Sequence, residues 1–141
     1  MLSDRTVALA GTTLVVAHGV IAGLHGAAHG ELGIEMSAAE NAFINSVIVA
    51  APVIAAIALW TRFARAGALL LAVSLTGALV FGAYHHYVAI SPDHVNHLPP
   101  GSLQGQFRIT AVLLVVSESV GIGIGVWGVA AVRAHLEHAH D

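Results

Sequence analysis

The sequence predicts an all-α integral membrane protein built as an antiparallel four-helix bundle. Of its 141 residues, 57% are hydrophobic and only 9% are charged, with a mean hydropathy of +0.82, whereas roughly a quarter of the residues of a soluble domain are charged. The apolar residues fall into four long runs, each able to cross a hydrocarbon core of about 30 Å as a helix. We therefore expect one transmembrane domain over residues 1–141, in contact with the lipid bilayer.

Composition excludes several classes of function. The chain has no cysteine, which removes disulfides, thiolate metal sites, iron–sulfur clusters and covalently attached haem. It has five arginines and no lysine, so it lacks the basic surface that binds nucleic acid. Ten histidines remain. Any metal ion would therefore be held by imidazole and oxygen ligands.

The first span is expected at about residues 6–28, because no Asp, Glu, Lys or Arg occurs between Arg5 and Glu31. A cleavable signal peptide is the alternative, since an arginine precedes this apolar run and small residues follow it. Three histidines would be unusual in a segment destined for removal, which favours a permanent span.

The second span is expected at about residues 40–60. Ser37 is a suitable N-cap and Glu40 stands three residues later, which is the capping-box pattern. Pro52 lies within this span and should kink it or remove a backbone hydrogen bond. Trp60 at its end is a membrane-interface anchor.

The third and fourth spans are expected at about 66–90 and 108–132, with one substantial loop, 91–107, between them. The short connection before residue 66 makes the second and third spans antiparallel neighbours. Beyond the fourth span, residues 133–141 form a polar tail. We expect the tail histidines to be solvated rather than part of a site; they are His135, His138 and His140.

Glycine spacing indicates close helix packing, because small residues four apart let backbones approach. The pairs with this spacing are Gly19 and Gly23, Gly26 and Gly30, and Gly121 and Gly125. We expect these pairs to pack helices against one another, although the same pattern also suits a homo-oligomer or a larger membrane complex.

The arginines predict the orientation of the four spans. Four of the five would lie on the side of the termini, and only Arg108 on the other. The positive-inside rule then makes both termini cytoplasmic, as in a multi-pass protein of a bacterial or archaeal inner or plasma membrane. Most histidines and acids outside the tail would gather at the opposite, outer end.

Three histidines organise the first span: His18, His25 and His29. At about 100° per residue they fall within one narrow stripe of a helix. A lipid-facing stripe would not carry three polar rings, so this face should point into the protein.

Depth along the spans separates two polar layers. His25, His86 and Asn45 each lie about 6 Å in from the outer helix ends, and His18 and Glu118 lie about 15 Å deep. An acid near the bilayer centre marks a functional site by default, and His18 is its natural partner. This pair is expected to form a second metal site, a proton path, a pair that tunes the outer site, or only an interhelical hydrogen bond.

The outer layer predicts a transition-metal site. His25 and His29 are four residues apart on one helix and can chelate one ion. Candidates for the remaining ligands come from other segments: His86, His85, Glu40, Asn45, His94 and His97. His85 and His86 point about 100° apart, so at most one faces the bundle. The structural alternative is that these histidines hydrogen-bond to backbone and lipid headgroups.

Three functions follow from this sequence. The first is a membrane protein that holds copper, zinc or non-haem iron near its outer end, as an oxidoreductase or a metal-handling subunit. The second is a b-type cytochrome whose haem is ligated by His25 and His86, since the first and third spans are diagonal in an up-and-down bundle. The third is a non-catalytic or pH-responsive small subunit of a membrane complex, because histidines titrate near neutral pH.

Overall fold

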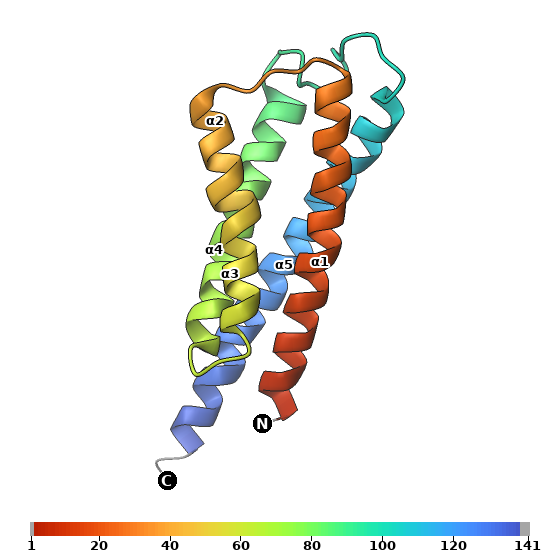
Figure 1. Ribbon diagram of the computed structural model, residues 1–141. Helices are drawn as coiled ribbons and strands as arrows, with labels where there is room; N and C mark the ends of the chain where they lie inside the picture. The colour runs from red at the N-terminus through yellow and green to blue at the C-terminus, as the bar shows by residue number, and fades with distance from the viewer. Residues whose placement is uncertain (1, 139–141) are drawn as a thin grey trace.

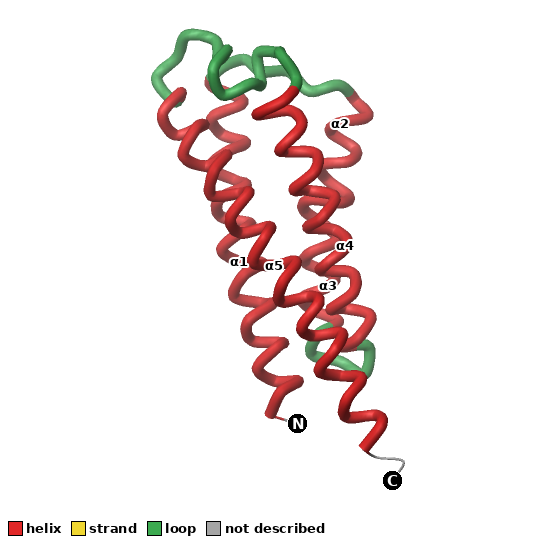
Figure 2. Tube along the Cα trace, turned by 180° about the vertical axis from the view of Figure 1, so that it is seen from behind, coloured by secondary structure: helices red, strands yellow, loops and turns green. Residues whose placement is uncertain are grey.

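The computed structural model describes the backbone of residues 2–138 and the side chains of residues 4–131. It is helical throughout, with no strand in this part of the chain (Figures 1 and 2). The elements in chain order are α1 (Leu2–Glu31), α2 (Ala38–Phe43), the π-helical segment η1 (Ile44–Ala50), α3 (Ala51–Ala58), α4 (Ala64–Ala83), the π-helical segment η2 (Tyr84–Val88) and α5 (Gln104–His138).

These elements form four rods long and apolar enough to cross a membrane: Asp4–Glu31, Ala38–Ala58, Ala64–Val88 and Gln104–Ala131. Both termini lie at the same end of the bundle as the short connection between α3 and α4 (Figure 1). The antiparallel four-helix bundle predicted from the sequence is therefore confirmed. Many large apolar side chains on its outer surface are exposed, among them Val20 and Ile57, which suits contact with lipid.

The order of the rods around the bundle decides which faces meet. α5 packs extensively on both α4 and α1, and α3 packs on α4, whereas α1 and α4 share few contacts. The first and third rods are thus diagonal, as expected for up-and-down connectivity. A side chain on α1 therefore meets one at the end of α4 across the centre of the bundle.

The ends of the helices follow their local sequence. Gly33 has φ +64 and ends α1 in a Schellman arrangement, with Ile34 N donating to His29 O at 3.0 Å. The capping box predicted at Ser37 and Glu40 is present. Glu31 accepts hydrogen bonds from the backbone N–H groups of Ser102 and Leu103, at 3.0 and 3.2 Å, and so ties the start of α5 to the end of α1.

Pro52 acts on the second rod through a wide turn rather than a break. The π-helical η1 precedes it, and Ala51 N donates to Ser46 O, five residues back. Proline lacks the N–H that would bond to the carbonyl of Ile48, and its ring clashes with that carbonyl in an α-helix. The wider turn removes this clash.

Glycine permits close packing on α5 and α4, and on α1 at Gly11 but not in its second half. An added Cβ at Gly125 would stand 2.8 Å from the backbone oxygen of Ala68, and one at Gly121 would collide with the side chains of Leu75 and Leu14. The close approach predicted for the α5 glycines is thus confirmed. The prediction for α1 is wrong within this chain, because an added Cβ would meet nothing within 4 Å at Gly19, Gly23, Gly26 and Gly30.

Two apolar clusters fill the bundle at different levels. The larger joins α1, α3 and α4 towards the end with the termini and includes Val15, Leu71 and Leu75. The smaller lies at the opposite end and includes Ala28, Leu32, Ile34 and Phe107. The buried histidines and acids lie between these two clusters and next to the smaller one. The side chains of His135, His138 and His140 lie outside the described residues.

Candidate metal centre

Helix α1 contributes two imidazoles to the centre of the bundle. His25 and His29 are one turn apart and therefore share a face; His25 is only 7% exposed and His29 is half-buried. His18, two turns before His25, is also buried. The stripe predicted from the sequence thus points into the protein as expected.

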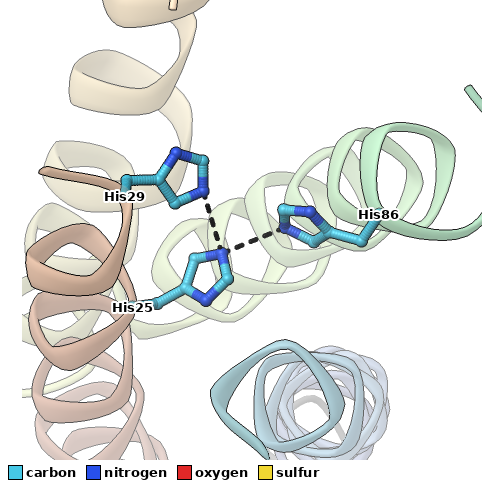
Figure 3. A group of neighbouring side chains, drawn as sticks. All are labelled: His25, His29 and His86. Atoms are coloured by element: carbon cyan, nitrogen blue, oxygen red, sulfur yellow. Dashed lines mark hydrogen bonds between the residues drawn. The ribbon is translucent and has the colours of Figure 1, made fainter. Parts of the chain in front are cut away.

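The third imidazole comes from the diagonal rod. His86 lies in η2 at the end of the third rod and is 6% exposed. Its Nε2 atom lies 3.2 Å from Nε2 of His25, and Nε2 of His29 lies 3.2 Å from the same His25 atom (Figure 3). The ligand nitrogens of all three rings lie within 4.8 Å of one another. Helices from opposite sides of the bundle therefore bring three nitrogens to one point.

The spacing of these nitrogens suits a small ion. Two nitrogens bound to a tetrahedral metal ion at about 2.05 Å stand about 3.3 Å apart. The separations of 3.2 Å from His25 Nε2 to the Nε2 atoms of His29 and His86 match that value. The third separation, between His29 and His86, is at most 4.8 Å, so these two rings would approach each other by up to about 1.5 Å to share one ion.

Thr110 on α5 fixes the tautomer of His25. Its hydroxyl donates to the carbonyl of Gln106 at 2.7 Å, so its oxygen acts as acceptor for Nδ1 of His25, 2.9 Å away. Nδ1 of His25 therefore carries the proton. The consequence is that Nε2 of His25 presents a lone pair to the centre of the cluster.

Asp93 fixes the tautomer of His86 in the same way. The backbone oxygen of Asp93 lies 3.2 Å from Nδ1 of His86, and its carboxylate Oδ1 lies 3.2 Å from the same nitrogen. Both oxygens are acceptors, so Nδ1 of His86 is the donor and Nε2 is left with a lone pair. Two lone pairs thus face each other at 3.2 Å between His25 and His86, an arrangement that a cation between them stabilises.

The carboxylate of Asp93 adds negative charge beside the three rings. Burial by itself raises the pKa of Asp93, but the close imidazoles of His29 and His86 outweigh burial and hold its pKa well below the usual range. Nε2 of His29 lies 3.1 Å from Oδ1 and 3.2 Å from Nε2 of His25, so it carries a proton that it would lose on ligating an ion. Neither carboxylate oxygen makes a hydrogen bond of standard geometry although both are buried. The groups beside this buried carboxylate are imidazoles and not Arg or Lys, so a cation at this position would be stabilised.

Phe107 holds the rings in place. It is fully buried, and its ring centroid lies 4.5 Å from that of His25, 5.1 Å from that of His29 and 5.3 Å from that of His86. Contact with all three imidazoles restricts their rotation, so the cluster is preorganised for an ion.

The structure shows which of the two neighbouring histidines of η2 joins the cluster. His86 enters the cluster, whereas His85 lies 3.7 Å from Oε1 of Glu40 and stacks on Phe81 with ring centroids 4.3 Å apart. Glu40 is occupied by this ion pair and by the capping box at the start of α2. Neither His85 nor Glu40 belongs to the trio of nitrogens.

Three other candidates lie away from the cluster. His94 and His97 pair with each other in the loop before α5, with their Nδ1 atoms 3.1 Å apart. Asn45 is exposed and its amide donates to the carbonyl of Asn41 at 2.8 Å. Equal depth does not fix the face of the helix on which a side chain lies, so it does not place Asn45 beside His25.

The two residues of the deeper layer do not pair with each other. Nδ1 of His18 lies 3.3 Å from the hydroxyl of Ser117, and its buried Nε2 makes no hydrogen bond of standard geometry. Glu118 is 3% exposed, and no ion pair or hydrogen bond joins it to His18 among the side chains of residues 4–131. His18 thus has an interhelical partner on α5 for one of its two ring nitrogens.

Asp93, Thr110 and Phe107 were not among the site residues expected from the sequence. Asp93 lies in a loop, and helical periodicity does not predict the path of a loop. The sequence indicates only that Asp93 lies near the outer end of the bundle. Thr110 and Phe107 are three residues apart on α5 and thus share a face. An isolated threonine in an apolar span is the signal that points to this face.

Comparison with known proteins adds no name to this geometry. No protein-family model matches the chain, and neither the curated proteins nor the solved structures searched contain a match. The fold and the cluster define a membrane-spanning four-helix protein with a buried group of three histidines able to hold a metal ion.

Proposed function

We propose that this protein is a membrane metalloprotein in which Nε2 of His25, His29 and His86 ligate one ion of copper, zinc or non-haem iron. The observation that carries the proposal is the 3.2 Å separation of the Nε2 atoms of His25 and His86, whose Nδ1 atoms both face oxygen acceptors, with a third nitrogen and a buried carboxylate beside them. A proton can bridge two nitrogens, whereas a transition-metal ion accepts three or four ligands.

The ion would keep a free coordination position. The protein supplies three imidazoles, and a cavity of about 300 Å³ reaches His25, His29 and His86. Three protein ligands with an open fourth position are typical of catalytic sites, whereas structural sites are closed. We therefore propose an enzyme, an oxidoreductase if the ion is copper or iron, in preference to a metal-handling subunit.

A b-type cytochrome is the second candidate, because His25 and His86 lie on diagonal rods and face each other. Two trans ligands of a haem iron, each about 2 Å from it, would stand about 4 Å apart with the porphyrin between them. The separation in the structure is 3.2 Å, and His29 occupies the position beside His25 that the porphyrin would need. These distances favour the ion.

We also propose that the centre lies at the non-cytoplasmic end. The support is the distribution of arginines in the sequence: Arg62 and Arg65 adjoin the connection between α3 and α4, at the end that carries both termini. Arg108, close to the metal centre, is the single exception, and its Nε donates to the carbonyl of Val95 at 2.9 Å.

Elemental analysis of detergent-purified protein, with its absorption spectrum, tests the proposal. We expect about one transition-metal ion per chain, as three converging imidazoles imply, and no Soret band. An intense Soret band would establish the cytochrome instead. Protein that neither retains a metal nor takes one up on titration would contradict both and favour a non-catalytic subunit.

Replacing Thr110 by valine should weaken metal binding without removing a ligand. The variant keeps the side-chain shape but loses the acceptor for Nδ1 of His25, and loss of such an orienting partner lowers metal affinity about 10–100-fold. Competition with a chelator measures this change. The matched control is Thr76→Val on α4, where the hydroxyl donates only to the carbonyl of Ala72; equal affinities in the two variants would contradict the role given to Thr110.

A further inference from the structure

The cavity beside the histidines extends inward along the bundle. It is lined by all four rods, and most of its wall is apolar, including Ile44, Ile48 and Leu114. Its strongly polar groups lie at two levels of the bundle. The histidines and Asp93 lie at one level, beside Thr110 of α5, and Glu118 lies about eight residues, or roughly 12 Å, further along the same helix. Such an apolar cavity with few polar groups is typical of a small-molecule site.

The cavity is covered at the end of the bundle. Ile34 and Met36, from the connection between α1 and α2, line it, and Asp93 brings the loop before α5 over the histidines. Leu32 and Ile34 belong to the apolar cluster around Phe107. A solute from the aqueous phase would have to displace this roof.

The side between α1 and the second rod is open. Near the centre, α1 presents Ala22 and Gly26 to the cavity, and α2 and η1 present Asn41 and Ile44. Gly26 is exposed although it lines the cavity, and an added Cβ there would meet nothing within 4 Å. The two rods lean apart at this level in Figure 1. Because Gly26 and Asn41 belong to membrane-spanning segments, this opening faces the lipid.

We propose that the cavity binds a molecule dissolved in the bilayer, with an apolar body and a terminal hydroxyl, which enters between α1 and α2–η1. Its apolar body lies along Ile44, Ile48 and Leu114, and its hydroxyl oxygen ligates the metal at the open position. This inference rests on the proposed function, since the metal supplies the polar end of the site. It adds the chemical class of the ligand and the route by which it arrives.

The test uses full-length protein in lipid nanodiscs, loaded with Co²⁺ as a spectroscopic metal, with 4-octylphenol as the probe. We expect saturable changes in the Co²⁺ absorption bands on addition of 4-octylphenol. Phenol, which lacks the apolar chain, should require at least about tenfold higher concentration, and the methyl ether 4-octylanisole should leave the bands unchanged. An equal response to phenol, or the same response to the ether, would overturn the proposed ligand class.

A matched pair of glycine variants tests the route. Gly26→Leu places a side chain in the opening and should weaken 4-octylphenol binding at least about tenfold with Co²⁺ content unchanged. Gly23→Leu is the control, because a Cβ at Gly23 also meets nothing within 4 Å but this residue does not line the cavity. Ala22→Leu, one turn before Gly26, serves as a second blocking variant if Gly26→Leu does not fold.

The outcomes separate this inference from the proposed function. Wild-type protein that binds Co²⁺ but shows no response to 4-octylphenol overturns the inference and leaves the metal centre standing, as does unchanged binding in both blocking variants. Wild-type protein that binds no Co²⁺ and no other transition metal overturns the metal centre and the inference with it.

Discussion

Replacing both His25 and His29 by alanine should reduce the metal content of the purified protein from about one ion per chain to background. The two substitutions remove two of the three nitrogens that converge within 4.8 Å, and His86 with one nearby carboxylate cannot retain an ion against a chelator. Elemental analysis after dialysis against a chelator measures the loss. The circular dichroism spectrum should stay helical, since alanine is the best helix former.

The control for this experiment is the double variant His94→Ala, His97→Ala. It also deletes two imidazoles that lie close together, at 3.1 Å between Nδ1 atoms, but these stand in the loop away from the trio. We expect its metal content to equal that of the wild type. Full occupancy in the His25, His29 variant, or equal loss in both variants, would place the metal elsewhere.

Helical periodicity made part of this centre predictable. Four spans, the inward stripe of His18, His25 and His29, and the equal depth of His25 and His86 all follow from rise and rotation per residue. These rules hold where the backbone is a regular helix. The fold class and the α1 half of the centre were therefore accessible from the sequence.

Irregular backbone hid the remainder. The choice of His86 over His85 falls within the π-helical η2, where rotation per residue departs from 100°, and equal depth alone did not fix the face on which Asn45 lies. Asp93 lies in a loop, where its position depends on tertiary contacts such as the bond from Val95 N to His86 O at 3.0 Å. Local pattern carries no information on such contacts.

The glycines of α1 show a different limit. Spacing by four identifies a surface that can be approached closely, but not whether anything approaches it. In this chain α5 uses Gly121, Gly125 and Gly128 for helix contacts, whereas Gly26 borders an opening into the cavity. The same sequence pattern thus closes the bundle on one helix and leaves it open on another.

Gly125→Ala should destabilise the bundle by about 1–3 kcal/mol, the usual effect of inserting a methyl group into a filled core. The added Cβ would stand 2.8 Å from the backbone oxygen of Ala68 and from the backbone nitrogen and Cβ of Ala72. Backbone atoms cannot rotate away as a side chain can, so α4 and α5 would have to separate. Unfolding in mixed micelles, followed by circular dichroism, measures the difference in free energy.

Gly123→Ala is the matched control, because the same methyl group at Gly123 meets nothing within 4 Å. There the substitution should be neutral or stabilise by up to about 1 kcal/mol, as the helix propensities of glycine and alanine predict. Since α5 carries Thr110, and α4 leads into η2 with His86, separation of these helices should also lower metal affinity in Gly125→Ala alone. Equal stability and affinity in the two variants would show that close approach of α4 and α5 does not hold the centre together.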